Sequence, residues 1–153
     1  MTATNALPEV LSAPHVLEYP YRRSVGEVLS AFFTGLRDGK VLGIRGSDGR
    51  VLVPPQEYDP VTAETLTEMV PVGDAGVVTT WAWMDHPTAK NSLQKPFAWA
   101  LVKLDGADTA MLHAVDAGSI DRMATGMRVK VRWRAERAGS IRDIQCFEPE
   151  ASA

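Results

Sequence analysis

Few residues in this chain have the types and spacing that catalysis requires. Among its 153 residues there are three histidines and one cysteine. His86 follows Asp85, which could orient the imidazole for acid–base chemistry, although an ordinary loop histidine is the alternative. His113 lies in a predicted strand and is expected to point toward solvent or a barrel mouth, and the strand around Cys146 favours a buried, inert thiol. We therefore expect no catalysis by this chain alone.

Residues 42–60 contain two tight turns of the kind that build a zinc ribbon. The segment LGIRGSDGRVLVPPQEYDP has an apolar run, a Gly-rich turn, a second apolar run and then Pro54-Pro55 and Asp59-Pro60. In a zinc ribbon each turn carries a Cys-x-x-Cys pair, because four thiolates close a tetrahedral structural site. Neither turn contains a cysteine here, and the first turn matches no phosphate-binding fingerprint. The sequence therefore predicts a ribbon hairpin that binds no metal.

The composition is that of an ordinary globular protein. Apolar residues make up 45% and charged residues 23% of the chain, and the net charge is −3. A generic nucleic-acid binder usually has a basic excess, so this balance counts against one. No apolar run approaches the roughly 18 residues of a membrane span, and the N-terminus lacks the pattern of a secretory signal. A lone cysteine suits a reducing compartment, so we expect a cytoplasmic protein without a membrane partner.

The chain divides into four predicted regions: an extended arm (1–23), an amphipathic helix (24–39), a ribbon with its connector (40–75) and a β-barrel (76–150). The arm contains three prolines and no periodicity, so it is either a partly disordered tail or a segment that lies on a partner through Tyr19 and Tyr21.

The predicted helix has a capping-box spacing at Ser24 and Glu27, and Gly35 and Gly39 are expected to end it. Its apolar residues recur at helical spacing, at Val25, Val28, Leu29, Phe32, Phe33 and Leu36. This face could pack on the same chain or on another subunit. We name Phe32, Phe33 and Leu36, with the two arm tyrosines, as candidate partner-binding residues.

Five strands are predicted from residue 76 onward, at residues 76–83, 97–104, 110–115, 128–134 and 141–147. A short helical patch at 119–124 separates the third and fourth strands, and imperfect alternation in the fifth indicates a bulge. This order fits an OB-type Greek-key barrel, although periodicity alone also allows another small barrel or a sandwich. The predicted fold class is mainly β: a five-stranded OB-type barrel preceded by an N-terminal helix and a degenerate, metal-free zinc-ribbon hairpin.

The ordered elements over about residues 25–150 resemble the family of zinc-ribbon OB-fold proteins that accompany thiolases and thiolase-like lipid-transfer enzymes. The segments that carry the resemblance are 31–36 (AFFTGL), 49–55 (GRVLVPP), 76–81 (GVVTTW), 96–105 (PFAWALVKLD) and 126–129 (GMRV). Alignment with the family's ribbon places its four cysteines at Arg45, Asp48, Asp59 and Thr62. Because none of these is a thiolate, we expect no zinc, and we expect Arg45 and Asp59 to pair across the vacated site.

The resemblance implies a non-catalytic accessory subunit that binds a thiolase-like enzyme in a hetero-oligomer. The partner would hold the acyl-CoA substrate and perform retro-aldol cleavage, for example of a steroid side chain, or acyl transfer, and this chain alone would bind no cofactor. In the loop at 85–96, His86, Lys90 and Lys95 are candidate contacts to CoA or substrate, and a solvated loop is the alternative.

A stand-alone single-stranded nucleic-acid-binding protein is the alternative function. OB barrels bind single strands through aromatic platforms and a basic groove. Strand residues of both kinds occur here: Trp81, Trp83, Phe97, Trp99 and Trp133, with Lys90, Lys95, Arg128, Lys130, Arg132 and Arg134. The aromatic residues at period 2 fill a barrel core equally well, so we treat nucleic acid as an unfavoured partner.

Overall fold

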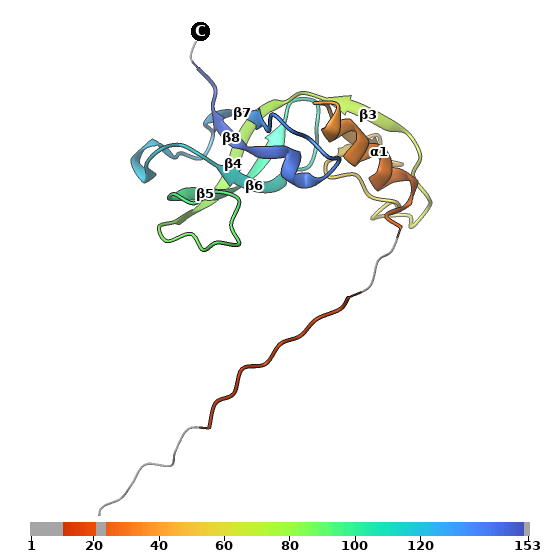
Figure 1. Cartoon of the computed structure of the whole chain (residues 1–153). Coiled ribbons are helices and arrows are strands. Elements are labelled where there is room, and N and C mark those ends of the chain that lie inside the picture. Colours follow the sequence, from red (N-terminus) through yellow and green to blue (C-terminus); the bar gives the residue numbers. More distant parts are fainter. Residues whose placement is uncertain (1–10, 21–23, 152–153) are drawn as a thin grey trace, which may run out of the picture.

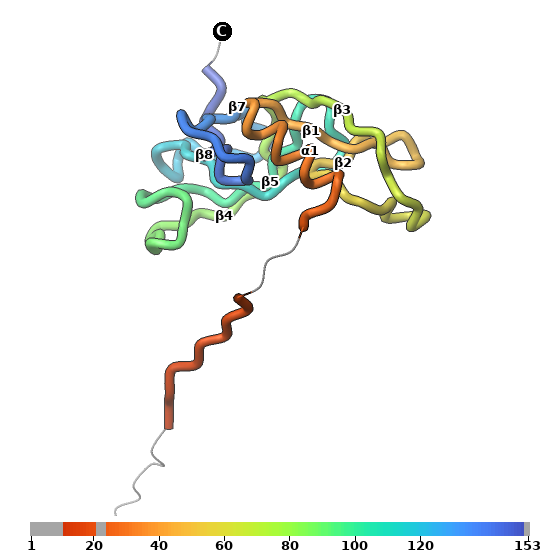
Figure 2. The backbone as a smooth tube through the Cα atoms, turned by 45° about the vertical axis from the view of Figure 1, so that its right-hand side comes forward, coloured from red at the N-terminus to blue at the C-terminus, as the bar shows by residue number. Residues whose placement is uncertain are grey.

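The computed structural model describes residues 11–20 and 24–151. One helix, a small three-stranded sheet and a closed five-stranded barrel follow one another along the chain. Residues 11–20 contain no helix or strand and extend away from this body (Figures 1 and 2). Among the described residues, no helix has the length and apolar character needed to cross a membrane.

The helix α1 spans Gly26–Arg37 and ends as predicted at only one of its two glycines. Gly39 has a φ of +73° and follows the last turn, where a left-handed residue is favoured. Gly35 lies inside the helix instead, and a Cβ there would lie 3.1 Å from Leu42 Cγ. The predicted capping box is wrong: Val25 is the N-cap, and no side chain caps the helix.

The apolar face of α1 packs on its own chain. Phe32 is 2% exposed and Leu36 is fully buried, and both belong to the core that the barrel strands share. The expectation that Phe32 and Leu36 bind a partner is therefore wrong. Phe33 is half-buried against the same core, Tyr19 is exposed, and Tyr21 lies outside the described residues.

The small sheet has the strand order β2–β1–β3. Strands β1 (Val41–Arg45) and β2 (Val51–Leu52) form the predicted hairpin. Strand β3 (Met69–Val72) lies in the segment expected to be a connector, and it pairs antiparallel with β1. It contains Pro71, which is tolerated because β3 is an edge strand of this sheet.

The barrel confirms the five predicted strands and closes in the order β4–β5–β6–β8–β7. The strands are β4 (Ala75–Met84), β5 (Phe97–Leu104), β6 (Met111–Val115), β7 (Arg128–Trp133) and β8 (Ile144–Pro149). Strands β6 and β8 run parallel, and all other neighbours are antiparallel. The short 3-10 helix η1 (Ile120–Arg122) matches the predicted helical patch.

The last strand starts later than the sequence indicated. Residues Ile141–Asp143 form a second 3-10 helix, η2, in which Ser140 and Asp143 make a capping box. The predicted bulge in β8 is present, since the pairing register shifts between Arg132 and Trp133 of β7.

Close packing of β4 on β5 depends on one glycine. A Cβ on Gly76 would lie 2.3 Å from the backbone oxygen of Lys103. Trp81, Trp83 and Trp133 are half-buried against the barrel core, which favours the packing interpretation of these rings.

Candidate functional site

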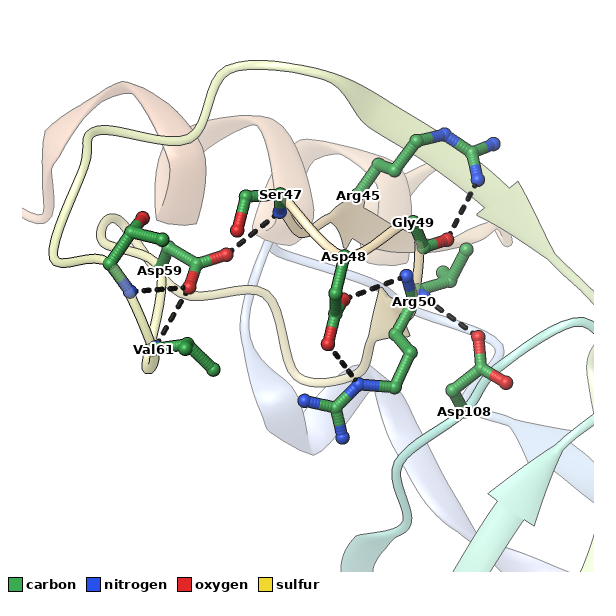
Figure 3. A network of polar contacts seen from close by, with 10 residues as sticks. Arg45, Ser47, Asp48, Gly49, Arg50, Asp59, Val61 and Asp108 are labelled. Atoms are coloured by element: carbon green, nitrogen blue, oxygen red, sulfur yellow. Dashed lines mark hydrogen bonds and ion pairs between the residues drawn. The ribbon is translucent and has the colours of Figure 1, made fainter.

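A single carboxylate joins the two ribbon turns, at one of the four positions that the sequence alignment assigned to the family's cysteines. Asp59 Oδ2 accepts a hydrogen bond from the Ser47 backbone N–H at 2.8 Å, across the gap between the turns (Figure 3). Its Oδ1 accepts hydrogen bonds from the backbone N–H groups of Val61 at 2.7 Å and Thr62 at 3.0 Å, within its own turn. Asp59 is 4% exposed. One buried side chain therefore cross-links both turns.

The charge of Asp59 follows from these contacts. The backbone N–H groups of Ser47, Thr62 and Val61 stabilise the carboxylate and hold the pKa of Asp59 far below its usual value. The side chain therefore stays ionised at all ordinary pH values, and three oriented N–H dipoles satisfy it.

The predicted ion pair between Arg45 and Asp59 is wrong. Arg45 Nε donates to Glu68 Oε1 at 2.9 Å, and its Nη1 donates to the Gly49 carbonyl oxygen at 3.1 Å. Asp48 pairs with Arg50 on the outside of the first turn. The four vacated positions thus do not converge on one point, and the described part of the chain contains no cluster of three or more His, Cys, Asp or Glu side chains able to hold a metal.

The ribbon is fastened to the barrel through the loop that follows β5. Asp108 Oδ2 accepts the Val51 backbone N–H at 2.8 Å, and Asp108 N–H donates to the Val51 carbonyl oxygen at 2.8 Å. Thr109 Oγ1 accepts the Val53 N–H at 2.7 Å and donates to the Val53 carbonyl oxygen at 3.0 Å. These contacts span more than fifty sequence positions, so no local pattern could have indicated them.

A cavity of about 570 Å³ opens at the surface of the barrel. Its lining comes from the β4–β5 loop, from β5 and β6, which we call its floor, and from η2, the residue that follows β7 and the first residue of β8. Its lining includes three basic side chains and no carboxylate: the basic residues are Lys90, Arg134 and Arg142. Trp99, Leu112 and His113 line its floor. We call this cavity the cationic pocket.

His113, which was predicted to point to solvent or to a barrel mouth, is buried in the floor of the cationic pocket. It is 7% exposed and stands edge-on to Phe147, with ring centroids 5.7 Å apart. Burial lowers the pKa of His113 below its usual value, so the ring is neutral at pH 7. Within the described chain, His113 Nδ1 is a buried side-chain atom without a hydrogen-bond partner.

The structure separates the three predicted CoA contacts. Lys90 lines the cationic pocket, and His86 is exposed on the same loop but does not line it. Lys95 Nζ instead lies 2.8 Å from Asp116 Oδ2, a buried carboxylate that Arg132 also binds at 2.8 Å. Sequence reasoning missed Arg142 as a pocket residue, because it belongs to the 3-10 helix η2, which is far from the β4–β5 loop in the sequence.

Cys146 is expected to be inert toward thiol reagents in the folded protein. It is fully buried, and burial raises the pKa of its thiol to about 11. A thiol whose pKa lies two pH units above the ordinary value has about 100-fold less thiolate at neutral pH. A disulfide reagent at pH 7.5 should therefore modify Cys146 at least about 100-fold more slowly in native buffer than in guanidinium. Equal rates in the two buffers would contradict the buried position.

Comparisons with known proteins agree with this fold. Residues 69–134, which run from β3 to the end of β7, match the family described as the C-terminal OB-fold domain of ChsH2. The crystal structure of a DUF35-family protein of unknown function from Sulfolobus solfataricus is 20% identical, with a TM-score of 0.59, and the match covers 82% of this chain and 85% of that chain. No curated protein sequence gives a match.

A second solved structure is described as the Ltp2–ChsH2(DUF35) aldolase. It is 18% identical to this chain, with a TM-score of 0.60 over 84% of this chain and 98% of that chain. At these identities the two structures show a shared fold. The family match agrees with the resemblance predicted from the sequence: residues 69–134, which contain four of the five barrel strands, are similar to the C-terminal OB-fold domain of ChsH2.

Proposed function

We propose that this chain is a non-catalytic accessory subunit of a thiolase-like acyl-CoA enzyme in the cytoplasm. The match of residues 69–134 to the ChsH2 domain carries the proposal. The shared fold with a chain of an Ltp2–ChsH2(DUF35) aldolase supports it, because that assembly pairs such a domain with a second protein. The partner would hold the acyl-CoA and perform retro-aldol cleavage, as in steroid side-chain degradation, or acyl transfer.

The described part of the arm is the surface best suited to a partner. Leu17 is 68% and Tyr19 is 69% exposed, and the segment 11–20 that contains them extends away from the body of the chain (Figure 1). Large apolar side chains on an extended segment are costly to leave in water, and a protein partner would cover them. The half-buried Phe33 on α1 remains a second candidate contact.

Co-expression tests the proposal. A tagged copy of this chain, expressed with a thiolase-like enzyme from the same genome, should retain that enzyme through affinity and size-exclusion steps. The double variant Leu17→Ser/Tyr19→Ser should bind it at least about 10-fold more weakly, because binding energy concentrates in a few anchors. Ile120→Ser removes a 48% exposed apolar side chain from η1 and serves as the matched control. A wild-type chain that retains no thiolase-like enzyme from its genome would refute the assignment.

A further inference from the structure

The three basic side chains of the cationic pocket differ from the other arginines of the barrel. Arg128 binds Asp105 and Glu150, and Arg132 binds Asp116 and Glu148. In contrast, the side chains of Lys90, Arg134 and Arg142 make no ion pair or hydrogen bond with the described residues. A chain with a net charge of −3 therefore gathers three unneutralised cations around one cavity. Such a site attracts an anion with more than one charge.

The same cavity offers flat and apolar surface between these charges. Trp99 is half-buried, and Phe97 holds its ring edge-on at a centroid distance of 5.1 Å. Leu112 is 61% and Ile141 is 39% exposed beside it. Uncovered apolar side chains at a charged rim suit a ligand that has both an apolar ring and anionic groups.

The floor of the pocket contains an unsatisfied polar group. His113 is nine-tenths buried, and its Nδ1 has no partner among the described residues. Because this atom is inaccessible from the cavity, His113 contributes a neutral part of the lining, and the charge offered to a ligand comes from Lys90, Arg134 and Arg142.

We propose that the cationic pocket binds a nucleoside phosphate, with its phosphates on Lys90, Arg134 and Arg142 and its base against Trp99. Guanidinium groups bind phosphate oxygens in pairs, and an indole face stacks on a nucleobase. The cavity of about 570 Å³ lies within the usual range for a ligand of this size. The proposal goes beyond the accessory role, in which the partner holds the acyl-CoA, because it places a ligand on this chain itself.

A single-stranded nucleic acid fits the arrangement less well. Binding a polynucleotide needs a basic track that follows the backbone beyond one pocket. On β7 the neighbouring basic residues are Arg128, Lys130 and Arg132, and each is paired with a carboxylate. Strand β7 therefore adds no unpaired cation to the three that line the cavity, and these three suit the phosphates of a single nucleotide.

Isothermal titration of the full chain without any partner tests the site. ATP and CoA are the two nucleoside phosphate probes, and a comparison of their affinities shows whether the site prefers a free nucleotide or a coenzyme that contains one. Inorganic phosphate is the third probe and measures the binding of a simple anion. Either nucleoside phosphate should bind with a dissociation constant below about 1 mM. Arg134→Gln/Arg142→Gln should weaken binding at least about 30-fold, and Trp99→Leu about 10-fold, from the lost charged contacts and stacking.

Lys103→Gln is the matched control for charge, because Lys103 is exposed on β5 and does not line the pocket. It should leave binding unchanged. Equal affinity for inorganic phosphate and the nucleotides would overturn the base-stacking part of the proposal. No binding of either nucleotide, or tighter and steeply salt-dependent binding of an oligonucleotide, would overturn the whole. The titration needs no partner, so failure here leaves the accessory role standing, and failure of co-purification leaves this site standing.

Discussion

Replacing Asp59 with alanine is expected to lower the melting temperature by roughly 5 °C or more and to separate the two ribbon turns. The carboxylate accepts three backbone N–H groups, from Ser47, Val61 and Thr62, and it is 4% exposed. Its removal leaves these donors without their partner and breaks the Ser47 bond, which is the Asp59 contact that crosses between the turns. The loss should exceed that of an ordinary surface substitution, for which the change is close to zero.

Thermal unfolding and limited proteolysis measure this effect. The two turns, at residues 46–50 and 59–64, should become new cleavage sites while the barrel stays intact. Asp48→Ala is the matched control, because Asp48 lies in the same ribbon but pairs with Arg50 at the surface. Its melting temperature should stay close to that of the wild type. Equal behaviour of the two variants would show that Asp59 does not hold the ribbon together.

The stabilisation of the fold by Asp59 should be lost only at acidic pH. Its pKa is lowered in the folded state by the surrounding N–H groups, whereas in the unfolded chain it is near 3.9. A lowered pKa stabilises the fold above the unfolded value, and this stabilisation is lost as the pH falls through the folded value. The difference in melting temperature between wild type and Asp59→Ala should therefore be constant from pH 8 to about pH 5 and shrink below about pH 4.

The sequence predicted the barrel well because its strands repeat with period 2 and end at turn residues. All five strands and the bulge in β8 follow from that local pattern. The pattern failed where tertiary context overrides local preference. Strand β3 lies in the predicted connector and forms by pairing with β1, and the segment Ile141–Asp143 forms a 3-10 helix that the capping box of Ser140 and Asp143 stabilises.

The candidate site was predictable only in part. The sequence shows that the ribbon contains no thiolate. It does not show whether Asp59 binds Arg45 or a set of backbone N–H groups. Backbone donors carry no sequence signal, and their direction depends on the turn conformation. The cationic pocket likewise joins Lys90, Arg134 and Arg142 from segments that periodicity cannot place side by side.

Replacing Phe32 with alanine is expected to destabilise the whole chain by about 3–5 kcal/mol. The ring is 2% exposed and belongs to the core shared by α1 and the barrel. Truncation of a buried phenylalanine removes apolar contacts and leaves a cavity that the surrounding strands fill only in part. The result tests the packing role that the burial of Phe32 and Leu36 assigns to the apolar helix face.

Phe33→Ala is the matched variant, because Phe33 is adjacent, half-buried and packed with its ring centroid 5.6 Å from that of Phe32. Chemical denaturation should give Phe33→Ala a clearly smaller loss of unfolding free energy than Phe32→Ala, because less of its surface is buried. If Phe32→Ala kept wild-type stability but lost its partner enzyme, the face would be an interface after all. A large loss of stability for Phe32→Ala and a small one for Phe33→Ala would show that α1 is part of the folding unit. The arm and the half-buried Phe33 would then be the remaining candidates for partner binding.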